Sequence, residues 1–177
     1  MQYDEDELIE TFGVVNFMLS ELDRFEIAVD HLKLQKLLFF AYGIHLSMFN
    51  EKLFPSQIQA WKLGPVVPVV YQEFKHKNGN EPITERLFIS HFDDKKNEPY
   101  IPDDENHNRH QNSVRIAAGA YGYKESSHLV DIAHKEGRAW RKVYDPKRKN
   151  IAIKDADIIS DFDKEDLINK MERLLKD

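Results

Sequence analysis

Apolar residues recur at helical spacing through residues 31–49, and this pattern predicts the central helix of the fold. At about 100° per residue, one broad face of this helix collects Leu34, Leu37, Leu38, Ala41, Tyr42, His45, Met48 and Phe49. Such a face is expected to lie in the core. Asp30 precedes the run, and its carboxylate can accept hydrogen bonds from the free amides of a first helical turn. The helix is therefore expected to begin there.

The opposite stripe of the same helix has mixed chemistry and consists of Lys33, Lys36, Phe40, Gly43 and Ser47. A solvated stripe needs neither a phenylalanine nor a glycine. Either Phe40 packs beneath another part of the chain, such as the first or last helix, or the stripe is open and docks a partner. In the second case Gly43 would allow close approach and the lysines would pair with carboxylates at the rim. The first interpretation is favoured, because the flanking helices must pack somewhere.

Beyond this helix the apolar residues no longer recur at helical spacing. Residues 57–61 alternate like a short strand, and a Gly64-Pro65 corner follows. Proline lacks an amide and sets φ near the helical value, so Pro65 and Pro68 suit a helix start. An inward face at helical spacing comes next: Val67, Val70, Tyr71 and Phe74. The corner can serve to link a strand to the following helix, with Trp61 in the core, or it can be presented to a partner. The two interpretations are compatible.

The remaining pattern predicts further short elements. Helices are expected at residues 4–22, 114–123, 138–144 and 153–162, with another, short one capped by Ser126 or Ser127. A last helix should be capped by Asp163 and turn inward Leu167, Met171 and Leu174. Strands at 86–89 and 100–102, joined by a loop at 93–97, would form a small sheet with residues 57–61. The expected class is α+β, mostly α: one helical domain spanning residues 1–177 with a small antiparallel β-sheet.

Composition narrows the class of protein. Of the 177 residues 41% are hydrophobic and 32% are charged, which is typical of a soluble globular protein. The chain has no cysteine, which excludes disulfides, thiolate metal sites and a thiol nucleophile. The N-terminus is acidic, unlike a signal peptide. The longest apolar run is interrupted by Lys33, Gln35 and Lys36, so no membrane span is predicted and a cytoplasmic location is expected.

Catalytic and metal-binding patterns are weak. Among eight histidines, His107 and His110 are three positions apart, but they lie in a polar stretch without a further ligand motif. His45 is expected to be a core histidine hydrogen-bonded to a neighbour. No nucleophile motif and no glycine-rich phosphate loop is present. No catalytic residue, metal or other cofactor is therefore expected, and the chain is not expected to be an enzyme.

Two basic clusters stand out, the first formed by Arg138, Arg141 and Lys142 and the second by Lys147, Arg148 and Lys149. Nucleic-acid binding needs a cationic footprint, and the formal net charge of −6 disfavours it. A solvated face and loop are the favoured interpretation of both clusters.

The segment LQKLLFFAYGIHL followed by AWKLGPVVPVVYQEF resembles the signature of the Panacea domain, the SocA-like antitoxin family. A second, weaker match involves Leu129, His134 and Trp140, within DIAHKEGRAW. Alanine stands where the family favours threonine before the histidine, and the tryptophan is displaced. His134 and Trp140 are expected to pack locally.

The resemblance implies an antitoxin that neutralises a cognate toxin protein by direct contact, often in phage, prophage or mobile-element settings. One branch of the family presents the toxin to a protease, so the alternative is a protease adaptor or a phage-encoded interaction protein. A hydrolase or nuclease is a third, less favoured class. The candidate partner-binding residues are Lys33, Lys36, Phe40, Gly43, Trp61, Lys62, Gly64 and Pro65.

Overall fold

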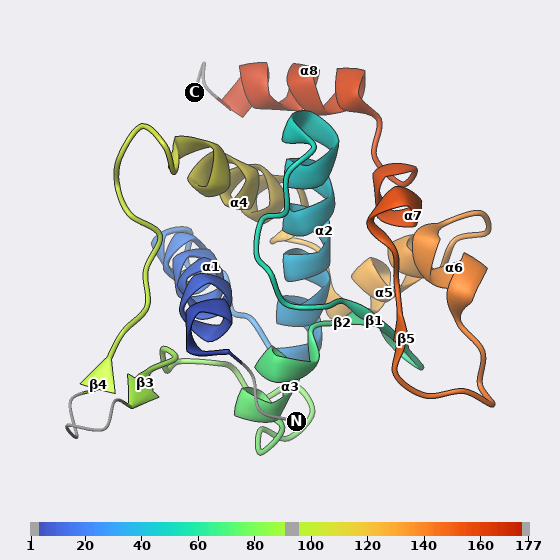
Figure 1. The fold of residues 1–177 in the computed structure, drawn as a ribbon, viewed down its shortest axis with the longest axis horizontal. Helices are drawn as coiled ribbons and strands as arrows, with labels where there is room; N and C mark the ends of the chain where they lie inside the picture. The colour runs from blue at the N-terminus through green and yellow to red at the C-terminus, as the bar shows by residue number, and fades with distance from the viewer. Residues whose placement is uncertain (1–3, 91–95, 175–177) are drawn as a thin grey trace.

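The computed structural model describes residues 4–90 and 96–174. Helix α2 (His31–Phe49) runs through the middle of the molecule (Figure 1). The other helices are α1 (Glu5–Arg24), α3 (Pro68–Phe74), α4 (Asn108–Tyr121), α5 (Ser126–His134), α6 (Ala139–Val143), α7 (Asp155–Ile159) and α8 (Lys164–Leu174). Helices α1 and α4 lie on one side of α2, and α5, α6 and α7 lie on the other. The predicted class, mostly α with a small antiparallel sheet, is confirmed.

Helix α2 is central because apolar residues lie on several of its faces and other elements cover it on every side. Its predicted N-cap is confirmed, since the Asp30 carboxylate accepts a hydrogen bond from the Lys33 amide at 2.7 Å. Asn50 ends the helix in the left-handed region, with a φ of 56°. Every residue from 33 to 46 is buried, so both the apolar face and the mixed stripe are covered by other elements.

The mixed stripe of α2 is closed by aromatic side chains from later in the chain. Phe40 is 3% exposed; its ring stacks on Tyr121 at 4.3 Å and meets the edge of Phe162 at 6.5 Å. A Cβ atom at Gly43 would overlap the Phe162 ring. The interpretation in which Phe40 packs beneath another part of the chain is thus confirmed, and the open docking stripe is not formed.

The predicted core histidine is also confirmed. His45 is fully buried, and its Nδ1 lies 2.9 Å from Ser113 Oγ on α4. Because the Ser113 hydroxyl donates to the Arg109 carbonyl at 3.0 Å, the His45 Nδ1–H is the donor to Ser113. Burial lowers the pKa of His45 to about 4.

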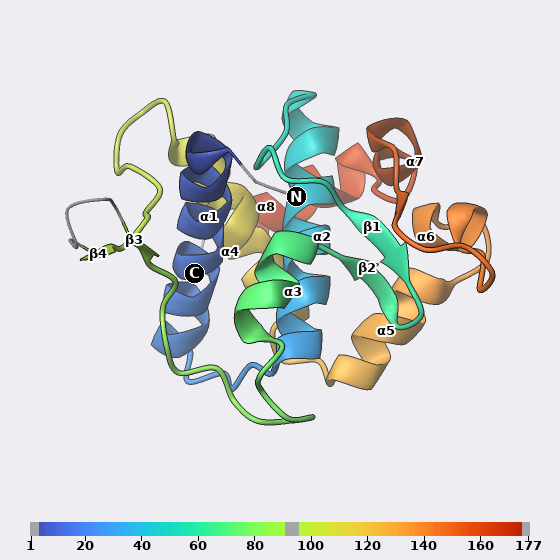
Figure 2. The same cartoon turned by 60° about the horizontal axis from the view of Figure 1, so that its bottom comes forward.

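The small sheet contains β1 (Gln59–Trp61), β2 (Gly64–Val66) and β5 (Ile151–Ala152), in the order β2-β1-β5. Strands β1 and β2 form a tight antiparallel hairpin in which Trp61 faces Gly64, and β5 pairs antiparallel with Gln59 and Ala60. Figure 2 shows the hairpin reaching from α3 towards α5. The sequence correctly predicted β1, whereas the Gly-Pro corner proved to be a strand of its own that precedes α3.

The predicted composition of the sheet was wrong, because neither of the strands expected at 86–89 and 100–102 joins the sheet of β1. Strand β3 (Ile89–Ser90) pairs with β4 (Lys96–Asn97) in a separate two-stranded sheet, so the segment at 100–102 is not the return strand. The partner of β1 is instead β5, which follows the second basic cluster. Most of the predicted loop at 93–97 lies outside the described residues. A strand of two residues carries too short a pattern for sequence periodicity to reveal it.

The helix caps were predicted with mixed success. Asp163 accepts from the amides of Glu165 and Asp166 at the start of α8, as predicted. Asp4, expected inside the first helix, instead caps α1 by accepting from the Asp6 amide. The predicted serine cap of α5 is wrong: the N-cap is Glu125, and Ser126 Oγ donates to the Asp30 carboxylate. Leu167 is buried as predicted, while Met171 and Leu174 lie where side chains are not described. No helix in the described ranges is long and apolar enough to cross a membrane.

Candidate functional site

The two segments of the sequence signature meet in space beneath the β1–β2 hairpin. Lys36 comes from α2, Gly64 and Pro65 from β2, His134 from the end of α5, and Trp140 from α6. Contacts join α2 to β2, and β2 to α5. We call this group, Lys36, Gly64, Pro65, His134 and Trp140, the hairpin support.

Lys36 is the most unusual member of the hairpin support. The side chain is fully buried, and its Nζ donates to the Pro65 carbonyl at 2.8 Å. Burial lowers the pKa of Lys36 to about 7, because removing an ammonium from water disfavours its charged form. The neighbouring Gln35 also holds the hairpin, as its Oε1 accepts from the Val67 amide at 2.8 Å. Consecutive side chains of α2 therefore hold the segment that leads from β2 into α3.

Gly64 permits the close approach of these groups. Its φ is +105°, a region that L side chains rarely adopt. A Cβ atom there would lie 2.7 Å from Lys36 Cε, 3.1 Å from Lys36 Nζ and 3.4 Å from His134 Nε2. Both nitrogens are thus packed against the bare face of one glycine, and a larger residue would push them apart.

His134 and Trp140 form the far wall of the hairpin support. Their rings are stacked 3.6 Å apart with planes 9° from parallel, so the predicted local packing is confirmed. His134 Nε2 is buried and has no hydrogen-bond partner among the residues that the structure describes. Burial, and then the charge of Lys36, lower the pKa of His134. A neutral imidazole is therefore the form that this wall accommodates.

Trp140 connects this wall to the hairpin itself. The ring is 4% exposed, and its Nε1–H donates to the Trp61 carbonyl at 2.8 Å. On its other side Trp140 stacks on Tyr144 at 4.5 Å. Backbone groups near both ends of the hairpin turn, Trp61 O and Pro65 O, are thus bonded to buried side chains. We infer that the hairpin is held in one position.

The tip of the hairpin faces solvent. Trp61 is half-buried, with its Nε1–H donating to Gln59 and its ring in edge contact with Tyr71 at 4.8 Å. Lys62 is exposed, and Leu63 is 54% exposed. Leu63 and the half-buried Trp61 line the same surface groove, so the tip presents adjoining apolar side chains to solvent.

Two surface grooves flank this tip, and Trp61 and Lys62 line both. The first groove has a volume of about 390 Å³ and lies between the end of β1 and the loop after α6. The second has a volume of about 440 Å³ and is lined mainly by His31, Leu63, Val66, Tyr71 and Lys77. The tip thus forms a ridge between two depressions.

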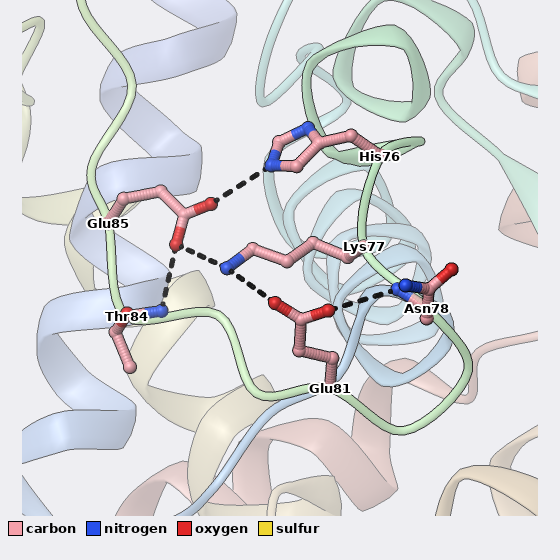
Figure 3. A network of polar contacts seen from close by, with 6 residues as sticks. All are labelled: His76, Lys77, Asn78, Glu81, Thr84 and Glu85. Atoms are coloured by element: carbon pink, nitrogen blue, oxygen red, sulfur yellow. Dashed lines mark hydrogen bonds and ion pairs between the residues drawn. The ribbon is translucent and has the colours of Figure 1, made fainter.

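A polar network fixes the far wall of the second groove (Figure 3). Lys77 Nζ lies 2.9 Å from a Glu85 oxygen and 3.4 Å from a Glu81 oxygen. Glu81 also accepts from the Asn78 amide, and Glu85 accepts from the Thr84 amide. The hydrogen bond to Glu85 raises the pKa of Lys77. This network ties the turn after α3 to the segment that follows it.

The eight residues predicted to bind a partner fall into two groups. Trp61 and Lys62 lie at the surface beside the grooves, and their role in binding stays a prediction. The other six are buried: Lys33, Lys36, Phe40, Gly43, Gly64 and Pro65. The Lys33 ammonium, for example, donates to the Gly122 carbonyl at 3.0 Å. These six can act only through the fold, because a buried side chain cannot touch a partner.

Sequence reasoning missed Leu63 and Tyr144 as surface residues beside the tip. Leu63 belongs to the quoted signature, and its position between Lys62 and a Gly-Pro pair was the available signal for an exposed turn. Tyr144 gave no comparable signal, because its place beside Trp61 depends on the pairing of β5 with β1.

The predicted histidine pair has other neighbours. His107 Nδ1 lies 2.8 Å from the Asp104 carboxylate, and the His110 ring lies 4.5 Å from that of His45. Within residues 4–90 and 96–174, no group of three or more histidine or acidic side chains is placed to hold a metal ion.

Comparison with known proteins identifies the family of the chain. The sequence model of the family described as "Antitoxin SocA-like, Panacea domain" matches residues 34–141, and the chain belongs to this family. It is also similar to Antitoxin SocA of Caulobacter vibrioides, with 28% identity over 145 residues, which cover 82% of this chain and 76% of that protein. No solved structure matches. The matched span holds the entire hairpin support, from Lys36 to Trp140.

Proposed function

We propose that this chain is an antitoxin that neutralises a cognate toxin protein by direct contact, without catalysis. Membership of the SocA-like family supports the antitoxin role. The observation that carries the mode of action is the rigidly held hairpin tip with its exposed Leu63. A surface that is already rigid loses little conformational entropy on binding, which favours a stable interface.

The tip residues would share the work of binding. Leu63 would insert into the partner, Trp61 would supply the adjoining apolar surface, and Lys62 would lie at the rim. The buried hairpin support would keep this surface in its binding conformation. Because the conformation of the hairpin tip would be fixed before binding, no loop would have to become ordered when the interface forms.

Co-expression with the product of the neighbouring gene tests this proposal. The wild-type chain should relieve growth arrest and co-purify with the toxin as a stable complex. Leu63→Asp should abolish both effects while leaving the melting temperature unchanged, because the side chain is exposed. Phe88→Asp is the matched control, since Phe88 is 47% exposed on a different segment; it should rescue fully. Rescue by trace amounts of protein without a complex would indicate turnover and refute the proposal.

A further inference from the structure

The first groove brings aromatic and basic side chains together at the surface. One wall is the end of β1 with Trp61 and Lys62, and the other is the loop carrying Tyr144, Arg148 and Lys149. Strand β5 pairs with Gln59 and Ala60 but not with Trp61. Asn150 turns the chain away just before β5, with a φ of 56°. The two walls therefore diverge beyond Ala60 and leave an open groove of about 390 Å³.

The loop that carries the cations is held by local hydrogen bonds. The Arg148 amide donates to the Asp145 carbonyl at 3.1 Å, and the Lys147 amide donates to the Asp145 carboxylate at 2.9 Å. The latter bond is the usual way in which an aspartate organises a turn through its side chain. At the base of the loop, Tyr144 is stacked on the buried Trp140. The groove is thus preformed on both sides.

The cations of this groove are free. The side chains of Lys62, Arg148 and Lys149 are exposed and have no ion-pair or hydrogen-bond partner in the described part of the chain. The first basic cluster differs, since Arg141 pairs with Glu136 and Lys142 lies 3.9 Å from Asp157. A patch of unpaired positive charge on a chain of net charge −6 creates a local field that attracts anions.

We propose that this groove binds an acidic segment of the partner protein, with carboxylates meeting Lys62, Arg148 and Lys149 and an apolar side chain packing beside Trp61 and Tyr144. This assignment rests on the proposed function and identifies the partner's chemistry. Arginine suits it because its guanidinium binds carboxylates with two parallel hydrogen bonds. Electrostatic attraction between this site and a negatively charged segment would also raise the association rate constant at low salt.

Nucleic acid fits the groove less well. Sequence-independent binding of a phosphate backbone draws its free energy from many cations that displace counterions. The groove offers only Lys62, Arg148 and Lys149, and the net charge of the chain repels a polyanion outside this patch. A short acidic peptide matches both the number of cations and the presence of aromatic walls.

Fluorescence anisotropy with purified full-length chain tests the assignment. The probe is a short fluorescein-labelled peptide in which glutamate alternates with tryptophan and leucine, and the competitor is a single-stranded oligonucleotide of equal charge. We expect the peptide to bind, and its affinity to fall as the salt concentration rises. For the double variant Arg148→Glu and Lys149→Glu, the affinity should be about tenfold or more lower than for the wild type. Lys135→Glu is the control, because Lys135 is exposed and unpaired outside the groove; its affinity should equal that of the wild type.

The outcomes separate the groove from the antitoxin role. Absent peptide binding, or binding that the double variant leaves intact, overturns the assignment. Tighter binding of the oligonucleotide, lost in the double variant, overturns it in favour of nucleic acid. The same variants are then tested in the co-expression assay. Full rescue of growth by the folded double variant would show that the partner does not bind in the groove, while the antitoxin role would remain supported. Failure of the wild type to rescue refutes the antitoxin role, whatever the peptide does.

Discussion

The Nζ of Lys36 lies 2.8 Å from the carbonyl oxygen of Pro65, 29 positions later in the chain. This bond joins the central helix to strand β2. The exposed hairpin tip, Lys62 and Leu63, directly precedes this strand. A buried lysine with a single carbonyl partner is costly, because its ammonium loses its hydration without gaining a counter-charge. The contact therefore makes stability depend on pH.

The first prediction concerns this dependence. We expect the free energy of unfolding to rise between about pH 7 and pH 10, because there the unfolded chain keeps a proton on Lys36 that the folded chain has released. Below about pH 7 both states are protonated, and the full penalty of the buried charge opposes folding. Lys36→Met should lack this rise, which is on the order of 4 kcal/mol across the window.

Urea denaturation followed by circular dichroism, repeated at several pH values, measures this difference. Lys135→Met serves as the control, because it removes an exposed lysine and should follow the wild-type curve. Parallel curves for the wild type and Lys36→Met would show that the buried ammonium has no part in the pH dependence.

The second prediction concerns Gly64. Gly64→Ala should destabilise the fold by about 2–4 kcal/mol, since it combines an unfavourable φ of +105° with a clash against the Lys36 side chain. Gly137→Ala separates the two effects, because Gly137 has a φ of +80° with no atom within 4 Å of the added Cβ. Its loss should be about 1–2 kcal/mol. Equal losses in thermal denaturation would mean that the close approach to Lys36 contributes nothing.

The third prediction concerns the closed stripe of α2. Phe40→Ala should reduce the free energy of unfolding by about 3–5 kcal/mol, because the ring is 3% exposed between Tyr121 and Phe162. Phe25→Ala is the matched control; Phe25 is 41% exposed, and the change should cost less than about 1 kcal/mol. Chemical denaturation gives both values. A Phe40→Ala variant as stable as the wild type would contradict the packing described here.

The fourth prediction concerns Trp140. Trp140→Phe retains an aromatic ring against His134 but removes the Nε1–H that donates to the Trp61 carbonyl. The carbonyl then keeps only its backbone partner Gly64, so we expect a loss of about 0.5–1.5 kcal/mol in stability. Trp61→Phe removes a comparable donor that bonds only the side chain of Gln59 at the surface, and it should cost less. Hydrogen exchange of the hairpin amides should be faster in Trp140→Phe but not in Trp61→Phe. An unchanged exchange rate in Trp140→Phe would show that Trp140 does not hold the hairpin in position.

Much of the fold could be predicted because its signals are local. The capping aspartates Asp30 and Asp163 act within their own first turns, and both were identified from the residues beside them. The burial of α2 followed from an apolar pattern that leaves little polar surface. The serine cap of α5 failed because Ser126 donates instead to Asp30, 96 positions away.

The candidate site was predicted only in part. Trp61, which could also have lain in the core, is half-buried beside the exposed Lys62, and the role of both in binding stays a prediction; Lys36 and Phe40, chosen from one face of the central helix, are buried. A helical wheel shows which residues share a face, not which faces other elements cover. The aromatic side chains that close this face, Tyr121 and Phe162, come from segments far along the chain.

The sequence by itself determined the class of fold, the main helices and the caps Asp30 and Asp163, since spacing and capping depend on neighbours within one or two turns. Only the tertiary structure decided that Lys36, Gly64 and His134 meet at one point, and that β5 borders β1. Such contacts form where distant segments bury a shared surface, and nothing in either segment alone specifies its partner. The groove beside Trp61 exists for the same reason, because its two walls are joined only through the pairing of β1 with β5.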